Sequence, residues 1–454
     1  MFFEIRGLYF SERDIDIERQ QLIDEGKDIE EIEGEFEDLK DFLKNKSSVE
    51  YQGKILSLFD RCQNLPQRKN YKYFEPLNFD DIKKEWSSNF FKVEKRLSEK
   101  EIKDKIYGGW YGRCAGCLLG KPVEGWHKEK IENFLKSTGQ FPLKYYIRND
   151  FDEEILKKYN VKKEGPFINN VKNMVEDDDI NYTVLALSLI EKYGFDFTVF
   201  DYSLNLLEKI PILKTWTAER IAYKNLINLI SPEYSASYRN PYREWIGAQI
   251  RTDFYGYITP GNPEKGVEFA YKDASITHIK NGVYSAMLIT AMISISFYEN
   301  EPEKIIKNAL NFIPKKSRLY EAVLEILDLW EKGNTYEEIS NKIHERWDEK
   351  NPHHWCHSIS NTQIVLIGLL WGNKDFGESI CKAVQIGFDT DCNGATVGSI
   401  IGVMLGMKNL PEEWIFPLNN IVETGVAGYS KIRISELCKK TYYIYKKGEK
   451  YGKS

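Results

Sequence analysis

Three short acidic segments of this sequence carry the residue types that bind divalent cations. Glu124 closes the segment GKPVE, residues 176–179 read EDDD, and Asp389 and Asp391 flank a threonine. A single acid before a helix is explained by capping and by the helix dipole. Consecutive acids repel one another, however, and a bound cation relieves that repulsion. We therefore expect the three segments to meet at one metal site.

The ligand chemistry favours Mg²⁺, with Mn²⁺ as the alternative. Carboxylate and hydroxyl oxygens suit hard cations, and none of the six histidines flanks an acidic segment. His353, His354 and His357 lie close together in an expected loop, where substrate contact and packing both remain open and zinc binding fits only loosely. Cys114 and Cys117 form a C-x-x-C pair without a second pair, which is typical of small residues on a helix face.

The elements that must position these acids are helices. From about residue 98 onward apolar residues recur at helical spacing and strand-like alternation is scarce, which predicts an all-α protein. Glycines recur at every fourth position in two stripes, Gly108 to Gly120 and Gly394 to Gly406. Glycine inside a helix costs about 1 kcal/mol relative to alanine, so each stripe needs a compensating close contact. We expect both helices to pack tightly in the core, with mutual packing as one arrangement.

The chain divides into a charged N-terminal part and a larger helical part. Between Ile29 and Leu43, apolar residues fall three or four apart and trace one face of an amphipathic helix. A segment rich in Asn, Pro, Arg and Lys follows at residues 63–76, which indicates a domain boundary nearby. We predict an N-terminal helical extension over residues 1–95 and a catalytic domain over residues 96–454.

Composition argues against several classes of protein. Lys and Arg number 63 against 69 Asp and Glu, and a net charge of −6 does not favour an extended nucleic-acid surface. The most apolar stretch, residues 283–298, is shorter than the roughly 20 residues of a membrane-spanning helix, so we expect a buried core helix. The first residues carry too many charges for a signal peptide, and seven scattered cysteines suit reduced thiols. These features predict a cytoplasmic protein without a membrane partner.

Three motifs, in a fixed order along the chain, resemble those of a known family. GGWYGRCAGCLLGKPVEGW holds the first acid, EDDDINYTVLAL the second group and GFDTDCNGATVGSIIGVMLG the third. Together they resemble the ADP-ribosylglycohydrolase family, of the dinitrogenase reductase-activating glycohydrolase type. The segments YREWIGAQIRTDF and EGKDIEEIE are similar to a longer bacterial subgroup of these proteins.

The resemblance implies a compact, orthogonal multi-helix bundle with two Mg²⁺ ions at its centre. Asp177 stands where the family has a threonine and Cys392 where a threonine or serine is common, so both are further candidate ligands. Ile180 replaces a second threonine and has no ligand atom, and the sulfur of Cys392 suits Mg²⁺ poorly. Five carboxylates carry over as metal ligands: Glu124, Asp178, Asp179, Asp389 and Asp391.

The resemblance also implies hydrolysis of a ribosyl glycosidic bond, with ADP-ribose on a modified acceptor as the favoured substrate. Cleavage passes through an oxocarbenium-like transition state and needs a carboxylate as general base. Glu124 and Asp178 are both candidates for this catalytic role, and the sequence does not separate them. Four residues are candidate substrate contacts, with packing or capping as the alternative for each: His278, Asn281, Gly387 and Asn393.

Two other functions remain open on the sequence. The same chemistry could act on a small ribosyl compound or nucleoside, for which an enclosed cleft would be expected in place of an open rim. A non-catalytic ADP-ribose-binding or crystallin-like protein could keep the fold without the reaction. Because the five carboxylates are all present, hydrolysis is the favoured hypothesis, and the oligomeric state stays open.

Overall fold

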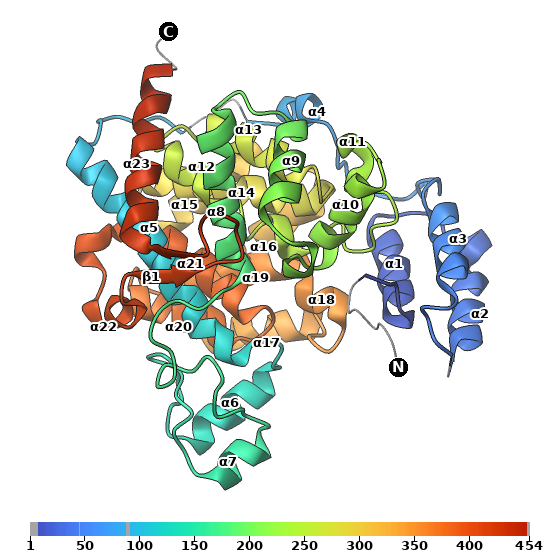
Figure 1. The fold of residues 1–454 in the computed structure, drawn as a ribbon, viewed down its shortest axis with the longest axis horizontal. Coiled ribbons are helices and arrows are strands. Elements are labelled where there is room, and N and C mark those ends of the chain that lie inside the picture. Colours follow the sequence, from blue (N-terminus) through green and yellow to red (C-terminus); the bar gives the residue numbers. More distant parts are fainter. Residues whose placement is uncertain (1–7, 45, 88–90, 452–454) are drawn as a thin grey trace.

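The fold is built almost entirely of helices in the computed structural model, which describes residues 8–44, 46–87 and 91–451 (Figure 1). This confirms the all-α prediction. Within the described residues, strand structure comprises β1 and β2, which pair antiparallel. The elements are α1 Glu12–Asp24, α2 Glu33–Leu43, α3 Gln52–Cys62, α4 Phe79–Lys84, α5 Glu99–Gly120, α6 Lys128–Ser137, α7 Glu153–Lys158, α8 Asp178–Tyr193, α9 Val199–Lys209, α10 Thr217–Ile227, α11 Pro232–Ser235, α12 Asp253–Ile258, α13 Pro263–Ala274, α14 Lys280–Ser296, α15 Pro302–Ala309, α16 Arg318–Glu331, α17 Tyr336–Arg346, α18 Pro352–Cys356, α19 Ser358–Trp371, α20 Phe376–Gln385, α21 Thr390–Leu405, α22 Glu412–Ile415, β1 Ile421–Glu423, β2 Lys431–Arg433 and α23 Ile434–Tyr451.

The two glycine-striped helices, α5 and α21, pack directly against each other in the core. A methyl group added at Gly112 would lie 2.1 Å from the carbonyl oxygen of Gly398, and one at Gly116 would lie 1.9 Å from that of Gly394. Such backbone contact is possible only where neither helix carries a side chain, and dispersion between the two backbones offsets the propensity cost of glycine. The predicted tight packing is confirmed, and the two helices are antiparallel partners.

The antiparallel register brings the end of α5 to the start of α21. Gly120 lies against Thr390, whose hydroxyl donates to the Gly120 carbonyl at 2.9 Å. The acidic residues that follow α5 and those that begin α21 are therefore neighbours, although they are far apart in the chain.

Helix α8 joins this pair through a buried arginine of α5. The guanidinium of Arg113 donates to the Asp179 carbonyl at 2.7 Å and forms an ion pair with Asp253 at 2.7 Å. Arg113 is fully buried, and a buried charge is tolerated only when paired in this way. This anchor holds the start of α8 beside the end of α5.

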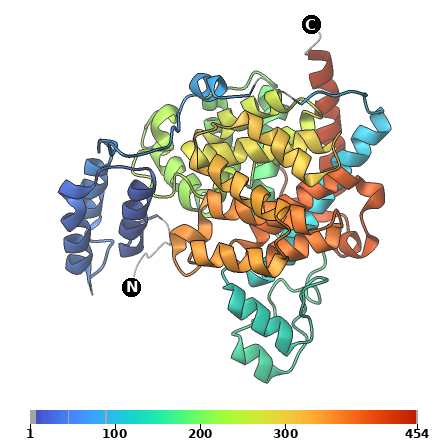
Figure 2. The same cartoon turned by 180° about the vertical axis from the view of Figure 1, so that it is seen from behind.

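The N-terminal helices α1, α2 and α3 lie to one side of the main bundle (Figures 1 and 2). They share an apolar cluster of their own, which includes Phe36, Leu43 and Phe59. Helix α1 is joined to the bundle by a buried ion pair between Glu18 and Arg243 at 2.6 Å. The extension over residues 1–95 remains a prediction, and its residues 1–7, 45 and 88–90 lie outside the described residues.

The apolar stretch near residue 290 forms the core helix α14. Its residues from Asn281 to Ser296 are all buried, which confirms the prediction of a buried helix. Across the described ranges, no helix combines the length and the apolar character needed to cross a membrane. One local prediction is wrong: His353 and His354 lie on the short helix α18 rather than in a loop, because Asn351 caps that helix and Pro352 suits its first position.

Candidate metal centre

One lysine ammonium reaches all three acidic segments. Lys121, on the 3-10 turn Lys121–Val123 after α5, lies 2.7 Å from the Glu124 carboxylate and 2.7 Å from that of Asp177. Its Nζ also lies 3.2 Å from Oδ2 of Asp391. The three segments therefore come together around one ammonium group, and the metal site expected there stays a prediction. Sequence reasoning missed Lys121, although it stands three residues before Glu124 in the quoted motif.

A second group of ligand atoms lies beside this lysine. Carboxylate oxygens of Asp179 and Asp391 and the sulfur of Cys392 all lie within 4.8 Å of one another, and all three residues are buried. Cys117 of α5 adds a thiol that donates to Asp179 at 3.7 Å, so one member of the C-x-x-C pair adjoins the site. Sequence reasoning had placed Cys117 on a helix face only. The stripe of glycines around it was the available signal that this face is in the core.

Helix starts supply part of the geometry. Asp177 caps α8, with its carboxylate accepting from the Asp179 backbone N–H at 2.9 Å. Asp389 stands at the N-cap position of α21 and accepts a weak hydrogen bond from the Cys356 thiol at 3.8 Å. Asp177 therefore acts as the N-cap of α8. The N-termini of α8 and α21 both face the cluster, and their dipoles favour negative charge there.

Burial and mutual repulsion dominate the electrostatics of the cluster. The neighbouring Asp391 carboxylate, followed by burial, raises the pKa of Glu124 to about 8. Burial, followed by the charge of Asp177, raises the pKa of both Asp178 and Asp179 well above the ordinary value. Burial, followed by the charge of Asp391, also raises the pKa of Asp389 well above the ordinary value. The cluster holds more negative charge than Lys121 can neutralise.

Unsatisfied oxygens show where additional positive charge fits. Oδ1 of Asp179 and Oδ1 of Asp391 are both buried without a hydrogen-bond partner. A buried carboxylate oxygen without a hydrogen-bond partner is destabilising, because it has lost its hydrogen bonds to water and no protein donor replaces them. A hard divalent cation, which takes oxygen ligands, fits these two atoms. The donor set therefore fits the predicted cation, with Cys392 as its one soft member.

Two of the predicted substrate contacts lie next to this cluster. The Asn393 amide donates to Asn361 at 2.8 Å, and its own oxygen is buried without a partner. Gly387 has a φ of +90°, a conformation that favours glycine. A methyl group there would lie 2.7 Å from the Glu349 carboxylate and 3.1 Å from the Lys128 backbone nitrogen, so backbone conformation and packing together account for glycine at this position.

The other two predicted contacts lie in polar networks of their own. His278 shares a 2.7 Å hydrogen bond with Thr277 and is fully enclosed in the core, where burial lowers its pKa well below the ordinary value. Asn281 donates to Glu75 at 2.7 Å and to Glu244 at 3.2 Å, so it ties α14 to the segment before α4. These contacts account for both residues structurally, and their roles toward substrate stay predictions.

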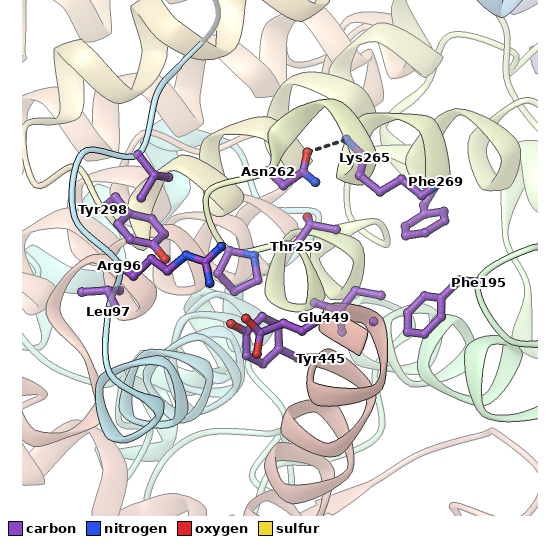
Figure 3. Close-up of a pocket in the computed structure, with 14 residues that line it drawn as sticks. Arg96, Leu97, Phe195, Thr259, Asn262, Lys265, Phe269, Tyr298, Tyr445 and Glu449 are labelled. Atoms are coloured by element: carbon purple, nitrogen blue, oxygen red, sulfur yellow. Dashed lines mark hydrogen bonds between the residues drawn. The ribbon is translucent and has the colours of Figure 1, made fainter. Parts of the chain in front are cut away.

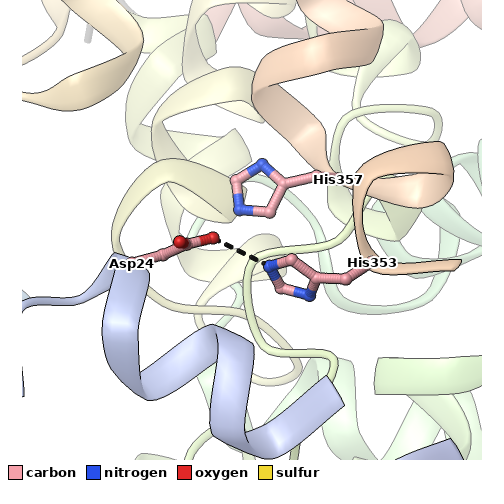
Figure 4. A group of neighbouring side chains, drawn as sticks. All are labelled: Asp24, His353 and His357. Atoms are coloured by element: carbon pink, nitrogen blue, oxygen red, sulfur yellow. Dashed lines mark hydrogen bonds and ion pairs between the residues drawn. The ribbon is translucent and has the colours of Figure 1, made fainter. Parts of the chain in front are cut away.

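A second group of side chains whose types can bind metals joins the N-terminal helices to the bundle (Figure 4). Nε2 of His353 lies 3.0 Å from Asp24 of α1, while its Nδ1 accepts from the Trp245 indole N–H at 3.0 Å. Nδ1 of His357 likewise accepts from the Ile359 backbone N–H at 3.1 Å. Both neutral rings must then carry their proton on Nε2, which makes that atom a donor rather than a metal ligand. The group is a docking contact for α1.

His353 should make the stability of the protein sensitive to acid. Burial lowers its pKa from 6.5 to about 4, so below pH 6.5 the unfolded chain binds a proton that the folded chain does not. The free energy of unfolding should therefore fall, by up to about 1.4 kcal/mol per pH unit, as pH drops from 6.5 to 4. Urea unfolding at pH 7, 6 and 5 measures this slope. His353→Gln keeps a hydrogen-bond donor and an acceptor and should make this slope smaller. Equal slopes for both proteins would contradict the lowered pKa of His353.

A pocket of about 510 Å³ lies apart from the cluster (Figure 3). It is lined by residues from the segment just before α5, from α13 and from the end of α23, among them Leu97, Phe269 and Tyr445. The acidic segments adjoin the opposite end of α5, and a helix of 22 residues spans about 33 Å. This pocket is therefore separate from the candidate metal centre.

Several known proteins are similar to this chain. A family model described as ADP-ribosylglycohydrolase matches residues 98–449. An uncharacterized protein of Archaeoglobus fulgidus is 25% identical over 330 residues, which cover 69% of this chain and 91% of that relative. The ADP-ribosylarginine hydrolase Tri1 of Serratia proteamaculans is 28% identical over 86 residues, 19% of this chain and 21% of Tri1. A solved structure described as an ADP-ribosylglycohydrolase-related protein complex has 18% identity and a TM-score of 0.47, with 76% of this chain and 99% of that chain covered.

Proposed function

Because this chain belongs to the ADP-ribosylglycohydrolase family, we propose that it hydrolyses the glycosidic bond between ADP-ribose and a modified acceptor, with Mg²⁺ as cofactor. The observation that carries the proposal is the convergence of three distant acidic segments on one point. Helix capping explains the acids at the starts of α8 and α21, but it gives no reason for them to meet each other and Glu124, which follows α5.

Buried oxygens are the proposed cation ligands. Asp179 and Asp391 each keep one buried oxygen without a hydrogen-bond partner, and Cys392 lies within reach of both. A bound divalent cation supplies positive charge that orients a ribose diol and makes water more acidic. The protein contributes rigidity, because the ligands stand at helix starts that the α5–α21 contact holds in place.

Glu124 is the proposed general base. Its side chain is 42% exposed, whereas that of Asp179 is fully buried, so Glu124 can reach a water and return its proton to solvent. In the reaction, a water oxygen bonds to the anomeric carbon and the carboxylate takes the water proton, while the acceptor leaves with the electrons of the broken bond and takes up a proton from solvent. Lys121, 2.7 Å away, favours the charged form of Glu124 that accepts the water proton, and a bound cation would offset the Asp391 charge that raises the Glu124 pKa. Asp178, half-buried, is the alternative base.

An accessible rim supports a modified acceptor over an enclosed nucleoside. Glu124 stands at the surface, and α6 begins four residues later at Lys128. Helices α6 and α7 project from the bundle beyond this point (Figures 1 and 2). The similarity to a protein described as an ADP-ribosylarginine hydrolase makes ADP-ribosyl-arginine the first substrate to test.

A release assay with matched variants tests this function. We expect ADP-ribose to be released from ADP-ribosyl-arginine with Mg²⁺ and not with EDTA, with ADP-ribosyl-serine and ribonucleosides assayed beside it. Glu124→Gln should lower kcat by roughly 100- to 10,000-fold, because a general base contributes that much. Glu129→Gln, at an exposed acid of α6, is the control and should leave kcat unchanged. Binding of ADP-ribose without turnover of any substrate would instead support the non-catalytic alternative.

A further inference from the structure

We propose that the Lys121 ammonium takes the place of one of two cations, so that this protein binds a single divalent ion. The proposal rests on the proposed function, since it concerns the same carboxylates. It departs from the two Mg²⁺ ions that the family resemblance implies.

The contacts of Lys121 engage all three acidic segments. Its Nζ donates hydrogen bonds to Glu124 at 2.7 Å and to Asp391 at 3.2 Å, and it forms an ion pair with Oδ2 of Asp177 at 2.7 Å. These partners come from all three acidic segments. The lysine therefore stands at the point where the segments meet, which is where a cation bridging them would stand.

The backbone fixes this position. Lys121 directly follows Gly120, whose close contact with Thr390 leaves no room for the chain to shift. Pro122 and Val123, the next two residues, are buried. The side chain itself is 21% exposed, so most of it is enclosed by the cluster. Its place among the carboxylates is set by the same helix contact that assembles the site.

Two buried carboxylate oxygens near the lysine have no hydrogen-bond partner and no contact with its ammonium group. Asp391 uses Oδ2 for Lys121, while its Oδ1 is buried without a partner. Oδ1 of Asp179 also has no hydrogen-bond partner and lies 3.7 Å from the Arg113 guanidinium, and Cys392 completes this group. Asp391 would then use one oxygen for the lysine and the other for a single cation. A second divalent ion would have to displace the ammonium and overcome repulsion between like charges.

Cation stoichiometry tests the proposal. Calorimetric titration of the full chain with Mn²⁺ should give one ion for the unaltered protein and two for Lys121→Met, which removes the charge and keeps the length. Electron paramagnetic resonance of the Mn²⁺ forms should show a spin-coupled ion pair only in Lys121→Met. Lys214→Met is the matched control, because Lys214 pairs with Glu176 at 2.6 Å beside the cluster and should leave the count at one.

The outcomes separate this proposal from the proposed function. Two ions in the unaltered protein would overturn the role of Lys121 and leave the hydrolase hypothesis standing. No bound ion at all would overturn both. A single ion in folded Lys121→Met would also overturn the substitution of a cation by this lysine. If that variant fails to fold, Lys121→Gln takes its place, and the count for the unaltered protein still decides.

Discussion

Asp389→Asn combined with Asp391→Asn should abolish divalent-cation binding while making the cation-free protein more stable. The two carboxylates lie in a cluster where burial and like charge raise the pKa of Asp389 well above its ordinary value. Amides of the same shape remove two negative charges from this repulsive group, so the free energy of unfolding without cation should rise by about 1 kcal/mol or more. Loss of the cation should lower kcat/KM on the order of 1,000-fold.

Calorimetry and thermal unfolding together measure both effects. In the unaltered protein Mg²⁺ should raise Tm, since it binds the folded chain, and in the double variant it should not. Glu412→Gln with Glu413→Gln removes the same charge from an exposed pair and should change neither property by more than about 0.5 kcal/mol. Unchanged Mg²⁺ uptake in the double aspartate variant would dismiss these residues as ligands.

Among the glycines described above, Gly116 is the position where substitution by alanine should destabilise the protein most. The new Cβ would lie 1.9 Å from the carbonyl oxygen of Gly394, a backbone atom that cannot rotate away. The helices α5 and α21 would have to separate, and overpacking of this kind costs about 3 kcal/mol or more. Because the same contact positions the acidic segments, the affinity for Mg²⁺ should fall as well.

The matched control is the same substitution where nothing obstructs it. Gly53, in the exposed first turn of α3, has no atom within 4 Å of an added Cβ. Gly53→Ala should therefore stabilise the protein by about 0.5 to 1 kcal/mol, the propensity difference between the two residues. Chemical unfolding of both variants measures the contrast. Equal stability of the two would contradict the backbone contact between α5 and α21.

The candidate ligands could be predicted from the sequence because their signal is local. Adjacent acids at residues 176–179 exceed what capping requires, and Asp389 and Asp391 repeat that pattern. Asp177 is an N-cap and a member of the acidic cluster at the same time, since it caps α8 and also pairs with Lys121. Residue type and spacing within one turn are sufficient to recognise such a group, even when its partners are unknown.

Lys121 and Cys117 could not be assigned in the same way. A lysine three residues before an acid is ordinarily a surface ion pair, and a cysteine on a helix face is ordinarily packing. Their importance depends on Asp391 and Asp179, which other segments supply. For His353, where zinc binding fitted the neighbouring histidines only loosely, the contacts with Trp245 and Asp24 fix a tautomer that does not support a metal ligand.

Local sequence patterns were sufficient to predict the helical class and the close packing along two glycine stripes, and to single out the candidate cation ligands, whose role stays a prediction. Each of these follows from neighbours within one or two helical turns, where backbone geometry sets the distances. The contact between Lys121 and Asp391, 270 residues apart, is visible only in the folded chain. That distance depends on the register between α5 and α21 and on the anchoring of α8, to which many weak packing contacts contribute and which no local pattern encodes.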